Sequence, residues 1–362
     1  MIIGIPKEIK DNEYRVAVVP SGVKVLRRNG HTVLIQSKAG DGSGLSDEEY
    51  VDAGGTVVQS AEEVFAQSDL VVKVKEPLPQ EYPLLKRGQA LFTFLHLASS
   101  RELTEALIKI GVVGIAYESV QLDDGTLPIL TPMSEIAGRM APIVASYHLQ
   151  ESRGGSGILI SGVPGVSSGK VTVLGAGTVG QNAARIALGL GARVVIFDRN
   201  FKTLKHVDDL FGGRIMTLSA NEHSIEKEVM SSDVVIGAVL IPGAKAPFVV
   251  RRELVSKMKK GSVIVDVSID QGGCIETSRP TSHSNPVFDV DGVMHYCVVN
   301  MPGAFPRTAT FALANMTLPY IIKLADSGWQ TATQEDRSLA RGLNVVDGKI
   351  TCKAVAEAFG LD

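Results

Sequence analysis

A glycine-rich turn is the segment of this sequence with the clearest chemical meaning. Residues 175–180 read Gly-Ala-Gly-Thr-Val-Gly; they follow an apolar run at 171–174 and precede a helix-compatible stretch at 181–190. A second apolar run at 193–197 then ends on Asp198. This order of strand, glycine turn, helix, strand and acid is that of a dinucleotide-binding βαβ unit. The sequence therefore predicts a dinucleotide site at this turn.

Each glycine of the turn has a predicted role, and so does the acid. Gly175 permits the tight turn, Gly177 lets backbone N–H groups approach a pyrophosphate, and Gly180 lets the helix pack closely on the strand. The partial positive charge of the helix N-terminus lies where the phosphates would bind. Asp198 would accept hydrogen bonds from the adenosine ribose and repel a 2′-phosphate, which favours NAD over NADP. The neighbouring Arg199 would weaken that preference.

A second set of polar residues is predicted at the ends of strands. Lys75, His96 and Asp270 each lie within a few residues of the end of an apolar run. Ligands of open α/β sheets bind outside the carboxyl ends of the strands, so these three side chains are predicted to face a binding site. Arg15 lies in a polar segment just before the apolar run 16–19 and is a fourth candidate.

A structural role is the alternative for each of these four residues. Arg15 would then be a surface cation in a salt bridge, and Lys75 would pair with its neighbour Glu76. His96 would be a satisfied core histidine, although its place beyond a strand favours an open, polar setting. Asp270 would cap the glycine turn that follows it. The convergence of all four on one predicted binding site favours the functional interpretation.

The elements that would position these residues alternate between strands and helices in both halves of the chain. Before the glycine turn, strands are predicted at 2–5, 31–35, 70–74, 90–94 and 112–116, and helices at 20–29, 61–67 and 101–110. After it, strands are predicted at 233–237, 262–267 and 296–299. The pattern predicts the α/β class, with two doubly wound, Rossmann-like domains separated by a cleft and linked by long helices.

The domain organisation is predicted to be discontinuous, because about 170 residues precede a turn that normally opens its domain. Residues 1–130 plus 306–362 would form the substrate (catalytic) domain, and residues 131–305 the NAD-binding Rossmann domain. Helices at 133–147 and 307–326 would connect them. Closure of two such domains would exclude water from a hydride-transfer path.

Composition excludes several classes of protein. The 362 residues are 44% hydrophobic and 21% charged, with a net charge of −3, which gives no reason to expect nucleic acid or an anionic membrane surface as a partner. No apolar stretch approaches the length of a membrane span or a signal peptide. The three cysteines lack metal-ligand spacing, so no metal site is predicted, and their sparseness suits a reducing cytoplasm.

Several short stretches together resemble the bacterial NAD-dependent L-alanine dehydrogenases, and the resemblance extends along essentially the whole chain. Besides the glycine turn, the matching segments are 4–8 (GIPKE), 13–16 (EYRV), 74–77 (VKEP), 92–97 (FTFLHL), 116–118 (AYE), 132–135 (PMSE), 162–165 (GVPG), 242–247 (PGAKAP), 270–273 (DQGG) and 300–302 (NMP). The resemblance implies oxidative deamination of L-alanine to pyruvate and ammonium by a cytoplasmic homohexamer.

The resemblance also implies roles for individual residues. Arg15 looks like the anchor of the substrate carboxylate, and Lys75 like a second contact to the carboxylate and the oxo or amino position. His96 and Asp270 look like the acid/base pair; which of them moves the proton stays open. The residues similar to the family's NAD contacts are Ser134, Thr178, Val179, Asp198, Val239, Leu240, Ile269, Arg279, Val298, Val299, Asn300 and Met301.

Three other functions remain as alternatives. The first is the nucleotide-binding subunit of a proton-translocating transhydrogenase, against which the segment 92–97 with His96 argues. The second is a dehydrogenase of a larger amino acid. The third is an NAD sensor without catalytic activity, which would leave Arg15, Lys75 and His96 together unexplained.

Overall fold

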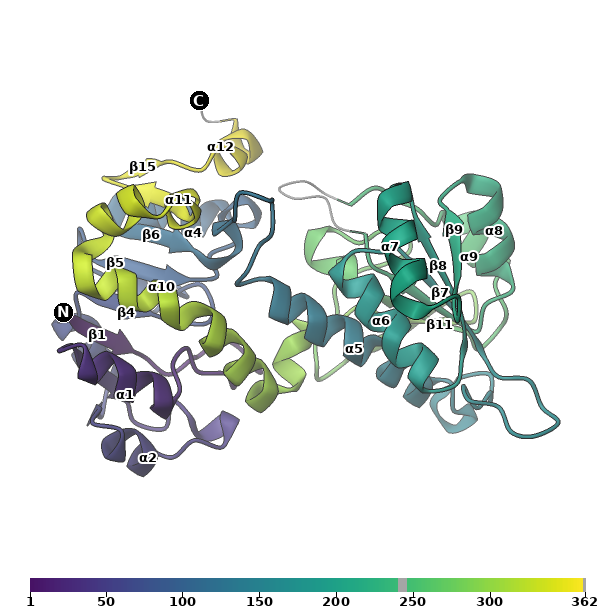
Figure 1. Ribbon diagram of the computed structural model, residues 1–362, viewed down its shortest axis with the longest axis horizontal. Coiled ribbons are helices and arrows are strands. Elements are labelled where there is room, and N and C mark those ends of the chain that lie inside the picture. Colours follow the sequence, from purple (N-terminus) through teal and green to yellow (C-terminus); the bar gives the residue numbers. More distant parts are fainter. Residues whose placement is uncertain (240–245, 361–362) are drawn as a thin grey trace. The chain divides into compact units, whose positions relative to one another are not determined.

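The computed structural model describes residues 1–239 and 246–360, which form two compact units (Figure 1). The first unit comprises Met1–Met133 and Gly303–Asp362, and the second comprises Ser134–Pro302. Each unit is built on its own twisted sheet.

The sheet of the first unit is mostly parallel. Its strand order is β15 (Lys349–Ile350), β14 (Leu343–Val346), β6 (Val113–Ala116), β5 (Ala90–Thr93), β4 (Leu70–Val72), β1 (Ile2–Ile5), β2 (Thr32–Gln36) and β3 (Thr56–Val58). The strands from β6 to β3 are parallel, whereas β14 runs antiparallel to β6, and β15 antiparallel to β14.

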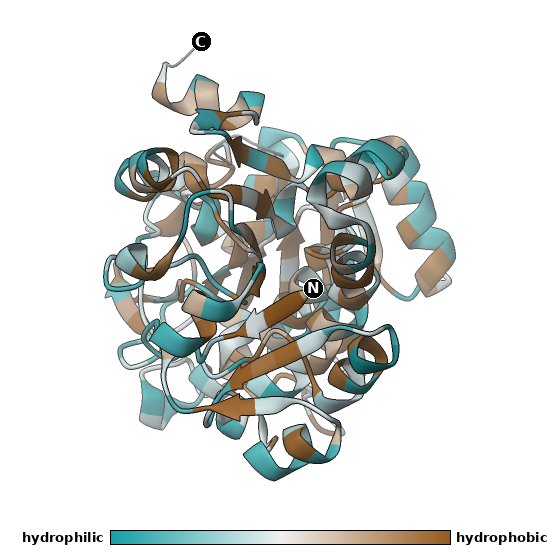
Figure 2. Ribbon diagram, turned by 90° about the vertical axis from the view of Figure 1, so that its left-hand side faces the viewer, coloured by the Kyte–Doolittle hydropathy of each residue, from teal (hydrophilic) through white to brown (hydrophobic). Residues whose placement is uncertain are grey.

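Helices cover both faces of this sheet. On one face, Phe65 of α3 (Ala61–Gln67), Leu107 of α4 (Arg101–Ile110) and Val355 of α12 (Lys353–Phe359) share a core with Val71 and Leu91. The helices α1 (Pro20–Arg28) and α10 (Pro306–Glu335) contact each other in front of the sheet in Figure 1. The remaining helices are α2 (Asp47–Asp52) and α11 (Arg337–Arg341). Figure 2 shows apolar strands inside this unit and hydrophilic residues on its outer helices and loops, as burial on both sides of a parallel sheet requires.

The sheet of the second unit has the order β12 (Val287–Val290), β13 (Val293–Tyr296), β11 (Val263–Asp266), β10 (Val234–Gly237), β7 (Lys170–Leu174), β8 (Arg193–Asp198) and β9 (Met216–Ser219). All strands from β13 to β9 are parallel, and β12 is antiparallel to β13.

Alternate residues of these strands enter two separate cores. Val171 and Val234 pack with α5 (Thr131–His148), α6 (Thr178–Gly189) and α7 (Phe201–Phe211). Val195 and Val235 belong to the other core, with α8 (Glu222–Met230) and α9 (Arg252–Val255). Both units are therefore doubly wound α/β structures, which confirms the predicted fold class.

The parallel strands of each unit follow the order 3-2-1-4-5-6 of a dinucleotide-binding fold. Strand order reverses between β1 and β4 in the first unit, and between β7 and β10 in the second. Ligands of such sheets bind at this switch point, outside the carboxyl ends of the strands. The fold thus indicates one binding region in each unit.

The structure corrects one predicted strand. The strand is Val293–Tyr296, not 296–299; the prediction began too late because the polar residue His295 interrupts the apolar pattern. That ring is nevertheless fully buried, and its Nε2 lies 2.7 Å from the Thr277 hydroxyl. Asp291 and Gly292, at φ 54° and 79°, join this strand to β12 in a tight hairpin that the sequence analysis missed.

The predicted helix at 307–326 also differs from the structure. The helical segment α10 continues to Glu335, but Gly328 interrupts it with φ 75° and ψ 158°. Because L residues rarely adopt this conformation, the glycine marks a break close to the predicted end.

Asp336 joins the end of α10 to the start of α11. Its Oδ1 accepts hydrogen bonds from the backbone N–H groups of Ser338 (2.9 Å) and Leu339 (3.2 Å), and its Oδ2 lies 2.5 Å from Lys323 Nζ. Although burial opposes it, hydrogen bonds from Lys323, the Ser338 side chain and the N–H of Leu339 lower the pKa of Asp336 from 3.8 to about 2.

Replacing this helix cap should lower stability. We expect Asp336→Ala to reduce the free energy of unfolding by about 1–2 kcal/mol near neutral pH, as measured by urea denaturation. Because the folded pKa is depressed, the stabilisation is complete above about pH 4 and is lost as pH falls towards 2. The difference between variant and parent should therefore shrink on acidification. The exposed pair of Lys205 and Asp209 provides a control, since Asp209→Ala should change stability little.

Candidate functional site

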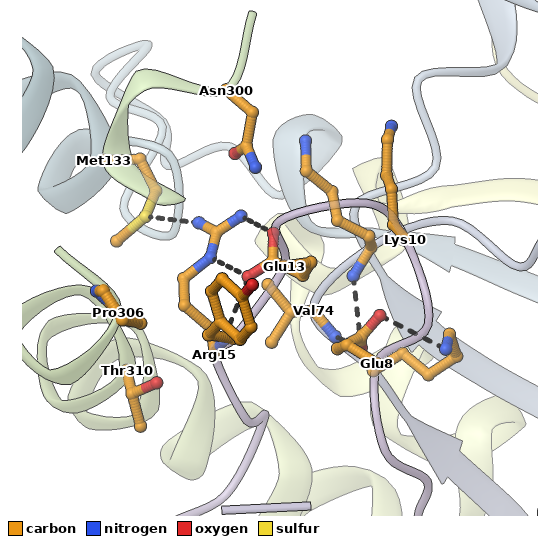
Figure 3. A network of polar contacts seen from close by, with 12 residues as sticks. Glu8, Lys10, Glu13, Arg15, Val74, Met133, Asn300, Pro306 and Thr310 are labelled. Carbon is orange, nitrogen blue, oxygen red and sulfur yellow. Dashed lines mark hydrogen bonds and ion pairs between the residues drawn. The ribbon is translucent and has the colours of Figure 1, made fainter. Parts of the chain in front are cut away.

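Arg15 is buried near the switch point of the first unit and is 2% exposed. Its Nε and Nη2 donate to the two carboxylate oxygens of Glu13 at 2.7 and 2.5 Å, and its Nη1 contacts Met133 Sδ at 3.2 Å (Figure 3). A guanidinium has five N–H donors in a fixed plane, so these contacts fix its orientation. Arg15 is therefore a buried cation whose orientation is fixed, and not a surface residue.

Lys75 follows β4 on the other side of the same switch point. Its side chain is mostly buried, and its Nζ lies 6.0 Å from the centre of the Phe94 ring. Its carbonyl accepts a hydrogen bond of 2.9 Å from Thr93. Its N–H lies 3.4 Å from Glu8 Oε1, which also accepts a 2.6 Å hydrogen bond from the N–H of Val74.

Glu8 belongs to a buried charge cluster beside Lys75. Lys73 Nζ lies 3.3 Å from Glu8 and 2.7 Å from Glu81, and all three side chains are at most 4% exposed. Burial raises the pKa of Glu8 to about 6, against the opposing effect of Lys73. The same two carboxylates raise the pKa of Lys73 despite its burial, so this lysine is charged. Through Glu8, which lies beside Val74 in Figure 3, the cluster fixes the backbone that precedes Lys75.

His96 lies beyond β5, and its imidazole is 41% exposed, which agrees with the predicted open setting. Its backbone has φ 48° and ψ 38°, an uncommon left-handed conformation for this residue. Glu118 holds this turn, because its two carboxylate oxygens accept from the N–H groups of Leu95 (3.2 Å) and His96 (2.6 Å). Glu118 also lies 3.9 Å from the imidazole Nδ1.

Phe94 is the shared neighbour of His96 and Lys75. Its ring is parallel to the imidazole of His96, with the ring centres 5.6 Å apart. Tyr117 packs edge-on against the same ring at 5.1 Å. The first unit therefore brings Lys75 and His96 to one aromatic surface, with Arg15 held across the same switch point.

The glycine turn of the second unit has the geometry that its sequence predicts. Gly175 has φ 104°, and a Cβ there would lie 2.4 Å from the carbonyl oxygen of Ala238. A Cβ on Gly180 would lie 1.8 Å from the carbonyl oxygen of Gly175, so only glycine lets α6 approach this closely. At Gly177, by contrast, a Cβ would meet no atom of the surrounding residues within 4 Å. The space beside Gly177 is thus open to a ligand.

Asp198 ends β8 next to this turn. Its Oδ2 accepts from the N–H of Ala176 at 2.9 Å and its Oδ1 from the N–H of Asn200 at 2.8 Å. A carboxylate can accept about four hydrogen bonds, so the ribose hydroxyls of a dinucleotide still fit it. Ser134 lies one helical turn before Gly138, where α5 meets α6 so closely that a Cβ would lie 2.3 Å from the carbonyl oxygen of Val179.

The segments after β10, β11 and β13 also meet. The N–H of Val239 donates to Ser268 Oγ at 3.0 Å, beside the buried Ile269. Asp270 is exposed, and its Oδ1 accepts from the N–H of Asn300 at 3.4 Å. The structure therefore joins Asp270 to the 298–301 segment. In that segment Val298 and Met301 are buried and Val299 is exposed.

The two remaining cofactor candidates are Arg279 and Leu240. The Arg279 guanidinium stacks at 4.3 Å on the ring of Phe288, in the edge strand β12, which is the neighbour of β13. Two residues further on, the N–H of Thr281 donates to the carbonyl of Cys297 at 2.9 Å, and the carbonyl of Thr281 accepts from the N–H of Val299 at 3.1 Å. Arg279 therefore belongs to the β13 end of this row, away from the glycine turn. Leu240 lies outside the described residues, as do Ile241 and residues 242–245.

Models of two protein domains together match nearly the whole chain. A model of the N-terminal domain of alanine dehydrogenase/PNT matches residues 4–137, and a model of the C-terminal domain matches residues 141–353. The chain belongs to the alanine dehydrogenase/PNT family. Among curated relatives, alanine dehydrogenase of Staphylococcus haemolyticus is 55% identical over 363 residues, and that of Mycolicibacterium smegmatis 54% over 361 residues. Each alignment covers 100% of this chain and 97% of the relative.

Solved structures of alanine dehydrogenase/PNT relatives show the same fold. A structure of L-alanine dehydrogenase superposes with a TM-score of 0.96 at 52% identity, covering 99% of both chains. A transhydrogenase from Sinorhizobium meliloti superposes with a TM-score of 0.82 at 26% identity, covering 98% of this chain and 100% of the other. Within residues 1–239 and 246–360, this family member has no helix both long and apolar enough to cross a membrane.

Sequence reasoning missed the part that three carboxylates play in holding the candidate residues of this alanine dehydrogenase/PNT family member. Glu13 binds Arg15, Glu118 holds the turn of His96, and Glu8 holds the backbone at Lys75. Glu8 and Glu13 lie between β1 and Arg15, and Glu118 lies two residues after β6. Their position at the carboxyl ends of strands was the available signal, whereas their partners depend on the folded sheet.

Proposed function

We propose that this chain is an L-alanine dehydrogenase, which converts L-alanine, water and NAD reversibly into pyruvate, ammonium, NADH and a proton. The observation that carries the proposal is 54–55% identity, over the whole chain, to proteins named alanine dehydrogenase. We assign residues 1–130 plus 306–362 to the substrate domain and residues 131–305 to the NAD-binding domain. The family membership makes the chain an oxidoreductase acting on amino-acid donors.

The row of proposed cofactor residues in the second unit is long enough for a dinucleotide. Apart from Ser134, and Arg279 before β12, these residues follow β8, β7, β10, β11 and β13, which are consecutive neighbours in the sheet. Four strand spacings amount to about 19 Å, a span suited to an extended dinucleotide rather than a mononucleotide. Asp198 supports NAD over NADP, because its carboxylate would repel a 2′-phosphate on the adenosine ribose.

The substrate would be bound by cationic side chains of the first unit. Arg15, oriented by Glu13, would bind the carboxylate of L-alanine, and Lys75 would contact the carboxylate and the amino or oxo group. NAD, when bound, supplies the acceptor for the hydride that leaves the substrate Cα. Lys75 and Asp270 would also offset the charge that develops around the tetrahedral centre when water attacks the resulting imine.

The proton transfers require an acid/base group, and the chain offers two. His96 or Asp270 would take a proton from the attacking water and return one to the leaving ammonia. His96 is held at one end of its ring by Phe94 stacking and the nearby Glu118, while Asp270 is held at Asn300. Both are exposed side chains on otherwise fixed turns, as an acid/base group must be to meet substrate and water.

A methyl group at Gly177 tests the cofactor site. We expect Gly177→Ala to raise the Kd of NADH about 10- to 100-fold, because its Cβ would occupy the space of the pyrophosphate and remove about one charge-assisted hydrogen bond. The fold should persist, since this glycine has φ −71° and open space around it.

Gly189→Ala is the matched control for this experiment. Gly189 ends the same helix, and its Cβ position is also open, so alanine there should leave the Kd unchanged and favour the helix slightly. Fluorescence titration with NADH measures both variants. Unchanged NADH affinity in Gly177→Ala would contradict the dinucleotide site at this turn.

A substrate screen tests the proposed activity against its alternatives. With NAD, we expect NADH to form fastest with L-alanine, and more slowly with L-serine, L-2-aminobutyrate and L-lysine. Fastest turnover of L-lysine would indicate a dehydrogenase of a larger amino acid, and NADH binding without turnover would indicate a sensor. The transhydrogenase alternative predicts hydride exchange between NADH and an NADP analogue; its solved relative is only 26% identical, against 52% for L-alanine dehydrogenase.

The assembly and location are part of the same proposal. We propose a homohexamer in the cytoplasm, which rests on the family resemblance and on the sparse, unpaired cysteines Cys274, Cys297 and Cys352. Sedimentation equilibrium of the purified chain measures the assembly directly, and a monomer at micromolar concentration would contradict it.

A further inference from the structure

A buried carboxylate holds the segment that carries Asp270. Asp266 is the last residue of β11, and it is fully buried. Its Oδ1 accepts from the N–H of Ser268 at 3.1 Å. Its Oδ2 accepts from the N–H groups of Cys274 (3.0 Å) and Ile275 (3.2 Å). One side chain therefore ties together the beginning and the end of the segment 267–275.

The surroundings of this carboxylate leave space for it and for little else. Gly237 is its partner in the neighbouring strand, and a Cβ there would lie 2.7 Å from Asp266 Oδ1 and 2.6 Å from Cys274 Sγ. Gly273 has φ 80°, and a Cβ there would lie 2.8 Å from Asp266 Oδ2. Glycines on the strand side and on the loop side thus bring backbone up to the carboxylate.

The segment held in this way reaches the proposed cofactor and acid/base residues. It forms a short 3₁₀ turn, Val267–Gln271, closed by hydrogen bonds from Gly272 to Ile269 and from Gly273 to Ser268, both 3.0 Å. Its Ser268 hydroxyl accepts from the N–H of Val239, and its Asp270 accepts from the N–H of Asn300. The Asp266 carboxylate therefore lies at the base of a turn that connects the carboxyl ends of β10, β11 and β13.

An uncharged residue at this position would avoid the cost of burying a carboxylate. Burial raises the pKa of Asp266, so the ionised form is disfavoured there. An asparagine has only one acceptor oxygen and would direct its NH2 group at the N–H of Ser268 or at those of Cys274 and Ile275. Only a carboxyl group with two acceptor oxygens bonds both ends of the segment at once.

We propose that Asp266 is a positioning residue for Asp270: its carboxylate fixes the segment 267–275 so that Asp270 stands at the strand ends beside Asn300. This inference rests on the proposed role of Asp270 in proton transfer. Asp266 itself touches no reacting atom in this account. Its effect on turnover passes through the placement of the Asp270 side chain.

The Asp266→Asn variant tests the inference in the full-length protein. A catalytic group displaced by about 1 Å loses about 100-fold in rate, so we expect kcat for L-alanine oxidation to fall about 10- to 100-fold. Binding of ADP-ribose, which probes only the adenosine half of the cofactor site, should be unchanged. The decisive readout is the double variant with Asp270→Asn, which should be less than about threefold slower than Asp270→Asn alone, because both changes disable one group.

Asp233→Asn is the matched control for a general loss of stability. Asp233 is also a buried carboxylate; it accepts from the N–H of Lys170 (2.8 Å) and from Lys259 Nζ (2.7 Å). It precedes β10 and so lies at the amino ends of the strands, whereas Asp266 lies at their carboxyl ends. We expect Asp233→Asn to lower the melting temperature and to leave kcat unchanged.

The outcomes separate this inference from the proposed function. Full turnover in Asp270→Asn would overturn the role of Asp270 and the inference with it. Loss of turnover in Asp270→Asn, with normal kcat in Asp266→Asn or with multiplying effects in the double variant, would overturn only the inference. If Asp266→Asn does not fold, Gly273→Ala tests the same contact, because its Cβ would press on Asp266 Oδ2 from the loop side; normal kcat there would also overturn it.

Discussion

Replacing His96 with alanine lowers kcat for L-alanine oxidation by about 10²- to 10⁴-fold and leaves the Kd of NADH unchanged. The size of the effect is that of removing a positioned acid/base group. NADH affinity should persist, because the proposed dinucleotide residues belong to the second unit, whereas His96 belongs to the first. Steady-state kinetics and NADH titration measure the two quantities on the same preparation.

The control for this variant is a histidine with no proposed role. His206 is exposed on α7, so His206→Ala should keep the kcat of the parent protein. Asp270→Asn, measured in parallel, shows whether one or both candidates are required. Full activity of His96→Ala would remove His96 from the mechanism and leave Asp270 as the proton carrier.

Arg15→Lys should lower kcat/KM for L-alanine by about 100-fold or more. A guanidinium holds a carboxylate through two parallel N–H bonds, and the ammonium that replaces it acts as a point charge. Each hydrogen bond to a charged group contributes about 1.5–3 kcal/mol, so losing the paired geometry costs about this factor. Lysine keeps a positive charge beside the buried Glu13, whereas alanine would strand that carboxylate and cost about 3–5 kcal/mol of stability.

Kinetics with L-alanine and with pyruvate measure the effect of Arg15→Lys on carboxylate binding. The KM for L-alanine and the inhibition constant of pyruvate should rise together in Arg15→Lys, because both ligands present a carboxylate to the same group. Arg28→Lys, an exposed change in α1, should alter neither constant. Unchanged constants in Arg15→Lys would show that another cation anchors the substrate.

The parts of the fold that sequence reasoning predicted are those with a strong local pattern. The glycine turn was predicted from its spacing, and the central parallel strands from short apolar runs between helices, whose residues are buried whichever partner strand they meet. The strands β3 and β9, whose residues are exposed or half-buried, were not predicted. The strand-end rule then selected Lys75, His96 and Asp270 without knowledge of the strand order. Each of them lies beyond a strand of the observed sheets.

The parts that were missed depend on turns and on tertiary contacts. Both edge hairpins, β12–β13 and β14–β15, turn at Asp-Gly pairs, Asp291-Gly292 and Asp347-Gly348, where all four residues have positive φ. This dipeptide was an available hairpin signal. The ion pair between Glu13 and Arg15 and the hydrogen bonds of Asp266 had no comparable signal in the sequence. Each contact joins groups that are buried only once the surrounding chain has folded around them.

The most direct test of the central claim follows the hydrogen on the substrate Cα. The protein is incubated with NAD and L-alanine that carries deuterium at Cα, and the nucleotide and the keto acid are analysed by mass spectrometry. Direct transfer predicts NADH with one deuterium on the nicotinamide ring, in equal amounts with pyruvate and ammonium. Deuterium released to water, or NADH formed without pyruvate, would contradict hydride transfer from L-alanine to NAD by this protein.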